Sequence, residues 1–157
     1  MKLQANIISA NEPFFGEIEF STQIDTITKI SEVAQDKDWL LPGFIDLHCH
    51  GGGGCDIMEG EKALREVLRT HAKHGTTSLL ATTITDNHEN LVSVFSDIKN
   101  VMSKRLPGEA SLLWAHLEDL FLSKDKLGEH PDLVRAFSRD GILQVQSIAA
   151  IILLTVD

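Results

Sequence analysis

The chain has 157 residues, of which 43% are hydrophobic and 24% are charged. This balance is typical of a globular protein and excludes a fibrous or disordered chain. The formal net charge of −9, without a run of lysine or arginine, argues against nucleic acid or an anionic membrane as a partner.

The sequence also predicts a cytoplasmic location. Residues 1–15 reach Asn, Glu and Pro before an apolar run of signal-peptide length can form. The most apolar run, residues 148–156, has about half of the roughly 20 residues that a membrane-spanning helix needs, and we interpret it as a buried strand. The two cysteines, Cys49 and Cys55, do not indicate a disulfide scaffold and suit a reducing compartment.

Residues 1–40 have the pattern of a small β extension. Short runs of strand-forming residues alternate with turn signals, of which Pro13 to Gly16 is the clearest. Three isoleucines, Ile24, Ile27 and Ile30, belong to the last of these runs. We therefore expect residues 1–40 to form a small portion of a β-sandwich, separate from the remainder of the chain.

Residues 41–157 show alternating strand and helix patterns, which indicate a parallel α/β sheet. We expect strands over residues 40–49, 76–85, 111–118 and 148–156, and helices over 60–74, 86–105 and 131–139. Gly75 can end the first helix, and the spacing of Asp86 and Glu89 predicts a capping box at the start of the second. The strands recur at roughly 35-residue intervals, so the chain holds about four βα units, half of the eight in a TIM barrel.

Two histidines mark the end of the first expected barrel strand. Alternation along a strand places Phe44, Asp46, His48 and His50 on one face and Cys49 on the other. Polar residues on one face of a strand often only meet water. The position of the pair at a carboxyl end, followed by GGGGCD, favours a metal site instead, because catalytic residues of βα barrels lie there and imidazole is a common zinc ligand.

Glu118 ends the third expected strand, where Trp114, His116 and Glu118 share one face. A carboxylate in this position either lies at the point where the strand meets solvent or completes a metal site with His48 and His50. The second interpretation is favoured because the histidine pair and Glu118 belong to strands of the same sheet.

Three other candidate ligands are weaker. His71 and His74 lie in the last turn of the first expected helix, where a histidine interacts favourably with the helix dipole, and we interpret both as structural. Cys55 is close enough in sequence to the histidine pair to reach a shared metal, but it lacks a partner at zinc-finger spacing.

Taken together, three stretches resemble the bacterial N-acetylglucosamine-6-phosphate deacetylases of the amidohydrolase superfamily. These are LPGFIDLHCHGGGGCDIMEG, THAKHGTTSLLATTIT, and WAHLE followed by Phe121 and KLGEHP. The resemblance implies a divalent metal, most often zinc, that activates water to release acetate from an N-acetyl amino sugar phosphate and leave glucosamine 6-phosphate. It also implies a partial TIM barrel with a small β-sandwich portion, and self-association of the chain.

Position by position, the resemblance implies that His48, His50 and Glu118 are metal ligands and that His130 contacts the sugar. In HLEDLF, Asp119 and Leu120 stand where the family has glycine and proline. The family's two further metal histidines and its catalytic aspartate belong to later strands, so we expect them beyond Asp157. The expected function is a metal-dependent deacetylase; the alternative is a truncated, non-catalytic relative that keeps the half-barrel and a weak metal site.

Overall fold

The computed structural model describes residues 1–118 and 139–155. Contacts divide the chain into two compact units, Met1–Pro42 and Gly43–Asp157. The predicted helix over residues 131–139 lies outside the described residues except for its last position.

The first unit is a mixed, four-stranded β-sheet with the strand order β3-β2-β1-β4. Its strands are β1 (Lys2–Ile7), β2 (Phe14–Phe20), β3 (Ile24–Ser31) and β4 (Trp39–Leu40). β1 pairs with β2 and β2 with β3 in antiparallel fashion, whereas β4 runs parallel to β1. Ala5, Ile7 and Ile18 are buried, and the three isoleucines of β3 are exposed.

One boundary differs from the prediction. The first barrel strand was expected to begin at residue 40, but Trp39 and Leu40 pair with Asn6 and Ile7 in the first unit. The barrel strand begins only at Phe44. Pro42 explains the break, because proline has no N–H group to donate to a ladder of strand hydrogen bonds.

The second unit contains a parallel sheet with the order β10-β9-β8-β5. Its strands are β5 (Phe44–Asp46), β8 (Thr76–Thr83), β9 (Ser111–Leu117) and β10 (Ile151–Leu154). A short hairpin of β6 (Gly51–Gly52) and β7 (Cys55–Asp56) and a 3₁₀ turn, η1 (Ile57–Glu59), follow β5. The sheet confirms the predicted α/β fold with a parallel half-barrel, and the first unit confirms the β extension.

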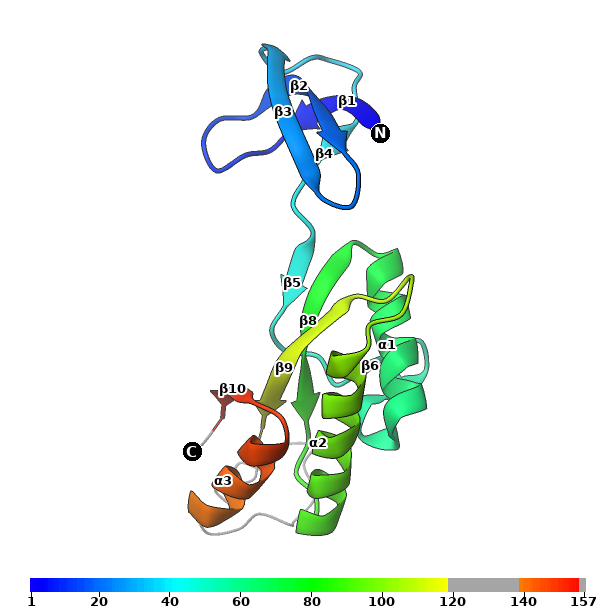
Figure 1. The fold of residues 1–157 in the computed structure, drawn as a ribbon, viewed down its shortest axis with the longest axis vertical. Coiled ribbons are helices and arrows are strands. Elements are labelled where there is room, and N and C mark those ends of the chain that lie inside the picture. Colours follow the sequence, from blue (N-terminus) through cyan, green and yellow to red (C-terminus); the bar gives the residue numbers. More distant parts are fainter. Residues whose placement is uncertain (119–138, 156–157) are drawn as a thin grey trace. The chain divides into compact units, whose positions relative to one another are not determined.

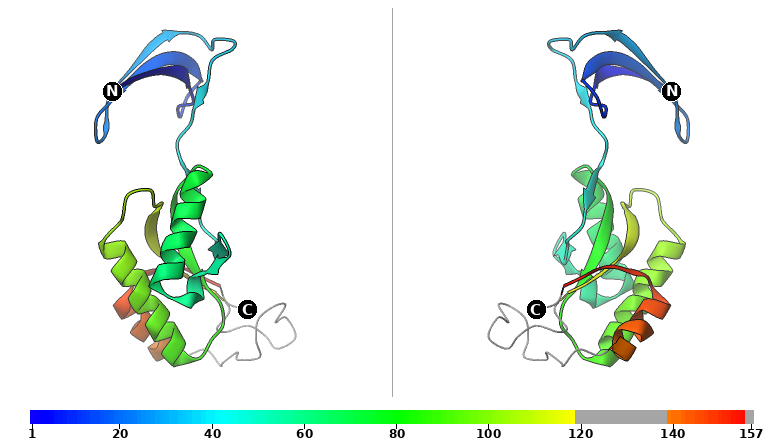
Figure 2. Two further views of the ribbon diagram at one scale, coloured as in Figure 1. Left: turned by 90° about the vertical axis from the view of Figure 1, so that its right-hand side faces the viewer. Right: turned by 90° about the vertical axis from the view of Figure 1, so that its left-hand side faces the viewer.

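The described part of this unit has three helices: α1 (Glu61–Lys73), α2 (His88–Ser103) and α3 (Arg139–Ile148). α1 contacts α2, and α2 contacts α3, so the helices follow one another in chain order (Figures 1 and 2). Their buried positions recur at helical spacing, as Leu64, Val67 and Leu68 do in α1. Among the described residues, no helix is both long enough and apolar enough to span a membrane.

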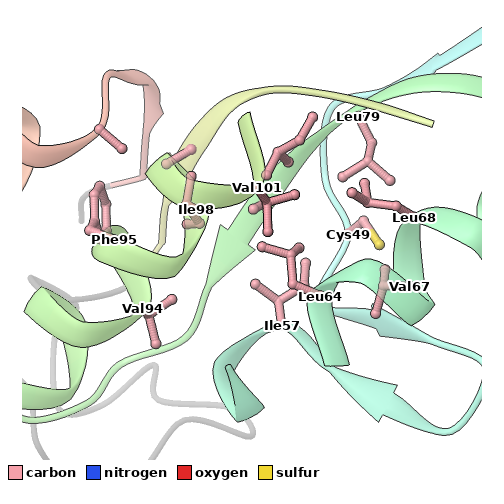
Figure 3. Close-up of a cluster of buried hydrophobic side chains, with 14 of the residues drawn as sticks. Cys49, Ile57, Leu64, Val67, Leu68, Leu79, Val94, Phe95, Ile98 and Val101 are labelled. Carbon is pink, nitrogen blue, oxygen red and sulfur yellow. The ribbon is translucent and has the colours of Figure 1, made fainter. Parts of the chain in front are cut away.

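The core lies where α1 and α2 meet the sheet. Figure 3 shows Leu68 of α1 beside Leu79 of β8, and the same cluster includes Leu64 and Val67 of α1 and Phe95 and Ile98 of α2. Burying a leucine or phenylalanine side chain of this kind contributes about 1.5–3 kcal/mol. This packing fixes the sheet against the helices and therefore fixes the strand ends from which the site is built.

Two further predictions are corrected: the N-cap of α2, and the start of the last strand, because part of the chain before that strand forms α3. The N-cap of α2 is Asn87, whose side chain accepts from the Asn90 backbone N–H, so the predicted capping box of Asp86 and Glu89 is wrong. α3 was not predicted, and among its ten residues Val145 is the one that is buried. The last barrel strand is accordingly shorter than predicted, from Ile151 to Leu154.

The glycine run has a packing role. Gly53 and Gly54 have positive φ angles of 63° and 79°, a region that favours glycine. A Cβ on Gly53 would collide with the Thr70 hydroxyl, and a Cβ on Gly52 would lie 3.0 Å from Nε2 of His71. The missing side chains therefore let the β6–β7 hairpin lie directly on α1.

Candidate metal site

His48, His50 and Glu118 converge at the carboxyl end of the parallel sheet. Oε2 of Glu118 lies 2.8 Å from Nε2 of His50 and 3.5 Å from Nε2 of His48. The two imidazole rings meet edge to face, with their centroids 4.9 Å apart. One potential ligand atom from each residue lies within 4.8 Å of the other two. The sequence named all three residues, and the structure brings them together.

Neighbouring strands hold the histidine pair in place. The regular strand β5 ends at Asp46, but the chain continues beside β8: the Cys49 backbone N–H donates to Oγ1 of Thr82 at 2.9 Å. The Thr82 backbone N–H in turn donates to the Cys49 carbonyl at 3.0 Å. Because Cys49 lies between the two histidines, these bonds fix the backbone on both sides of it.

Glu118 reaches the site because it directly follows β9, the strand next to β8. Its side chain is only 13% exposed, whereas those of His48 and His50 are 51% and 37% exposed. The carboxylate therefore lies at the inner side of the cluster, with the imidazoles between it and solvent.

His116 is a neighbour of the site that the sequence placed on the correct face but gave no role. It is buried, and its ring packs edge to face against that of His48 at a centroid distance of 5.1 Å. Its Nε2 lies 2.9 Å from Oγ1 of Thr155 and its Nδ1 lies 3.4 Å from Oγ1 of Thr82. Burial lowers the pKa of His116, an effect that the nearby Glu118 carboxylate opposes, so the imidazole is neutral at neutral pH.

The donor set fits a divalent metal. Zinc bonds to imidazole nitrogen and carboxylate oxygen at about 2.0–2.2 Å, so ligand atoms around a tetrahedral ion lie about 3.4 Å apart. The separations of 2.8 and 3.5 Å from Glu118 to the two histidines bracket that value. Two imidazoles and one carboxylate are also a known ligand set of catalytic zinc, with one position left open.

The other residues that the sequence singled out near the site are either not described by the structure or lie apart from this cluster. His130, Asp119 and Leu120 lie outside the described residues. Cys55 is absent from the groups of potential metal ligands found in the described part of the chain. Asp46 was expected on the same face as His48 and His50, but its carboxylate lies 3.7 Å from Nδ1 of His71.

The end of the strand explains the different direction of Asp46. Its Oδ1 accepts from the His48 backbone N–H at 3.1 Å, a local turn contact of the kind that aspartate often makes. Strict alternation of side chains therefore ends at Asp46, before the histidine pair.

Comparison with known proteins shows the family of the chain. Residues 39–146 match the sequence model of the Amidohydrolase family, and this range includes His48, His50 and Glu118. The chain belongs to the amidohydrolase family. The structure of this amidohydrolase chain is similar to a crystal structure of N-acetyl-D-glucosamine-6-phosphate deacetylase from Mycobacterium smegmatis, with a TM-score of 0.83 and 25% identity. That likeness covers 99% of this chain and 47% of the other.

One further relative and a second Mycobacterium smegmatis structure carry the same enzyme name. N-acetylglucosamine-6-phosphate deacetylase of Bacillus subtilis (strain 168) is 39% identical over 98 residues, which are 59% of the amidohydrolase chain and 24% of the relative. A mutant of the Mycobacterium smegmatis enzyme, solved in complex with N-acetyl-D-glucosamine-6-phosphate, gives a TM-score of 0.79 at 25% identity over 94% of this chain and 40% of that one. The chain therefore matches about a quarter of the curated relative's length and less than half of each solved chain.

Proposed function

We propose that this amidohydrolase is a metal-dependent hydrolase of the N-acetylglucosamine-6-phosphate deacetylase type. It would cleave the acetamide of an N-acetyl amino sugar phosphate, giving acetate and glucosamine 6-phosphate. The convergence of His48, His50 and Glu118 at the carboxyl end of the sheet is the observation that carries the proposal. The enzyme names of the similar proteins support the choice of substrate.

The three side chains would hold a divalent ion, and zinc suits them best. Without a proton, Nε2 of His48 and Nε2 of His50 would each offer one lone pair to the ion, and the carboxylate of Glu118 would offer a negatively charged oxygen. A divalent ion held there would act as a Lewis acid toward the amide carbonyl and would lower the pKa of water. The exposure of both imidazoles leaves a side from which substrate can approach.

The surrounding residues would position these ligands. His116, neutral and held between Thr82 and Thr155, supports the His48 ring from the inner side. A neutral imidazole at this place avoids a second positive charge beside the ion, which would weaken binding. By its resemblance to the family, His130 would contact the sugar.

Acetate release tests the proposal. The purified chain, supplied with zinc and N-acetylglucosamine 6-phosphate, is expected to release acetate, and the Glu118→Gln variant is expected to lose this activity. Glu89→Gln is the matched control, because Glu89 is an exposed glutamate in the first turn of α2. No release from the folded, zinc-loaded chain would contradict the proposed activity and favour a non-catalytic relative that keeps the half-barrel.

Self-association of the chain is part of the same proposal. The two edge strands of the described sheet, β5 and β10, carry apolar side chains that are exposed, among them Phe44, Ile45, Ile152 and Leu153. Exposed apolar side chains on a sheet edge favour pairing with a second copy. Size-exclusion chromatography is expected to give at least a dimer at micromolar concentration, and a monomer across the tested concentrations would exclude such pairing.

A further inference from the structure

A second cluster of potential ligands lies beneath the β6–β7 hairpin. Sγ of Cys49 is 3.2 Å from Nε2 of His71 and 3.3 Å from the carbonyl oxygen of Gly51, and Nε2 of His71 is 3.1 Å from the same oxygen. The three atoms therefore form a nearly equilateral triangle. They come from the segment after β5, from the last turn of α1 and from β6.

This cluster is separate from the site of His48, His50 and Glu118. The two groups of potential ligands share no residue. Cys49 is 6% exposed and belongs to the hydrophobic core, where Figure 3 shows its sulfur beside Leu68 and Val67 of α1. The His71 side chain is 22% exposed, so the cluster is partly open to solvent.

The three atoms of the triangle are rich in lone pairs. The Gly51 carbonyl oxygen only accepts, the Cys49 thiol has a single proton, and Nε2 of His71 offers a lone pair when the ring proton lies on Nδ1, the nitrogen 3.7 Å from Oδ2 of Asp46. A cation between the three atoms would be bound by all of them.

We propose that Cys49 Sγ, His71 Nε2 and the Gly51 carbonyl form a second metal site, for a thiophilic divalent ion such as zinc. Sulfur, nitrogen and oxygen ligands of a tetrahedral zinc ion lie about 3.4–3.6 Å apart, only a few tenths of an ångström beyond the distances in the triangle. Asp46 is the positioning residue that holds the ring of His71, as carboxylates behind zinc-bound histidines do. On binding, the Cys49 thiol gives its proton to solvent.

This second site goes beyond the proposed function. Cobalt binding to it can be measured separately from binding at His48, His50 and Glu118. A cobalt ion bound to thiolate sulfur has a charge-transfer absorption in the near ultraviolet, which the sulfur-free site of His48, His50 and Glu118 does not produce. Titration of the chain with cobalt is expected to produce this absorption. Cys55→Ser and Glu118→Gln are the matched controls and are expected to retain it.

Two variants are expected to remove the signal: Cys49→Ser should abolish the absorption, and His71→Gln should weaken cobalt binding at least about 10-fold, as loss of a metal-binding partner does. No absorption in the unchanged chain, or an absorption that survives Cys49→Ser, would overturn the proposal.

A second measurement keeps the test valid where Cys49→Ser does not fold. In the Cys55→Ser variant, zinc is expected to slow the labelling of Cys49 by a thiol reagent at least about 10-fold, since a metal-bound thiolate is shielded from reagents. An unchanged labelling rate with zinc would contradict a zinc–sulfur bond.

Discussion

Replacing Glu109 with alanine is expected to lower the free energy of unfolding by about 3–5 kcal/mol, because it removes one partner of a buried ion pair. The Glu109 side chain is fully buried, and its carboxylate accepts from Arg65 and Arg69 at 3.0 Å each and from the Leu106 backbone N–H at 2.9 Å. The residue thereby joins α1 to the turn before β9. Its loss leaves the guanidinium of Arg65, which is only 12% exposed, without its main internal partner.

Urea denaturation measures this effect, and Glu66→Ala provides the control. Glu66 pairs with the same Arg69 at 3.6 Å, but both side chains are exposed by 37% or more. Such a surface pair contributes about 0–1 kcal/mol. If Glu109→Ala costs no more than Glu66→Ala, the buried network does not stabilise the junction between α1 and β9.

Replacing His50 with glutamine is expected to reduce zinc affinity at the candidate site by more than about 100-fold. Loss of a residue that only supports a zinc ligand typically costs 10–100-fold, and a direct ligand should cost more. His50 is the histidine nearest Glu118, at 2.8 Å, so its removal leaves only two of the three converging side chains. Zinc binding by calorimetry in a Cys49→Ser background measures this site without the second one.

His74→Gln is the matched control for His50→Gln. His74 is an exposed histidine that caps the end of α1, and it belongs to neither group of potential ligands in the described residues. Zinc affinity is expected to stay unchanged in this variant. Equal affinities for the His50→Gln and His74→Gln variants would remove His50 from the site.

The sequence predicted the elements whose pattern is strong and local. The strand of Thr76–Thr83 and the helix of Glu61–Lys73 agree with prediction because their apolar residues follow one clear period and because Gly75, with a positive φ angle of 92°, directly follows the C-cap of the helix. Asn87 was missed as the N-cap because Asp86 and Asn87 are adjacent residues of similar capping preference. Only the packed helix shows which of the two lies at the first turn.

The candidate site was predicted because its geometry follows from strand ends. In a parallel sheet the carboxyl ends of neighbouring strands lie together, so a histidine pair on one strand and Glu118 on another were expected to meet. The contact of His71 with Cys49 was not predicted, since it joins a helix to a loop across 22 positions of the sequence. No local period encodes such a contact. From the sequence alone, a favourable interaction with the helix dipole was enough to explain a histidine at position 71, in the last turn of the helix.

The central claim is that His48, His50 and Glu118 bind a metal together, and the position of zinc in a crystal tests it most directly. Crystals of the chain grown with zinc should show an anomalous scattering peak about 2.0–2.2 Å from Nε2 of both histidines and from a carboxylate oxygen of Glu118. A zinc-free cluster in crystals that bind zinc elsewhere on the chain would contradict the account.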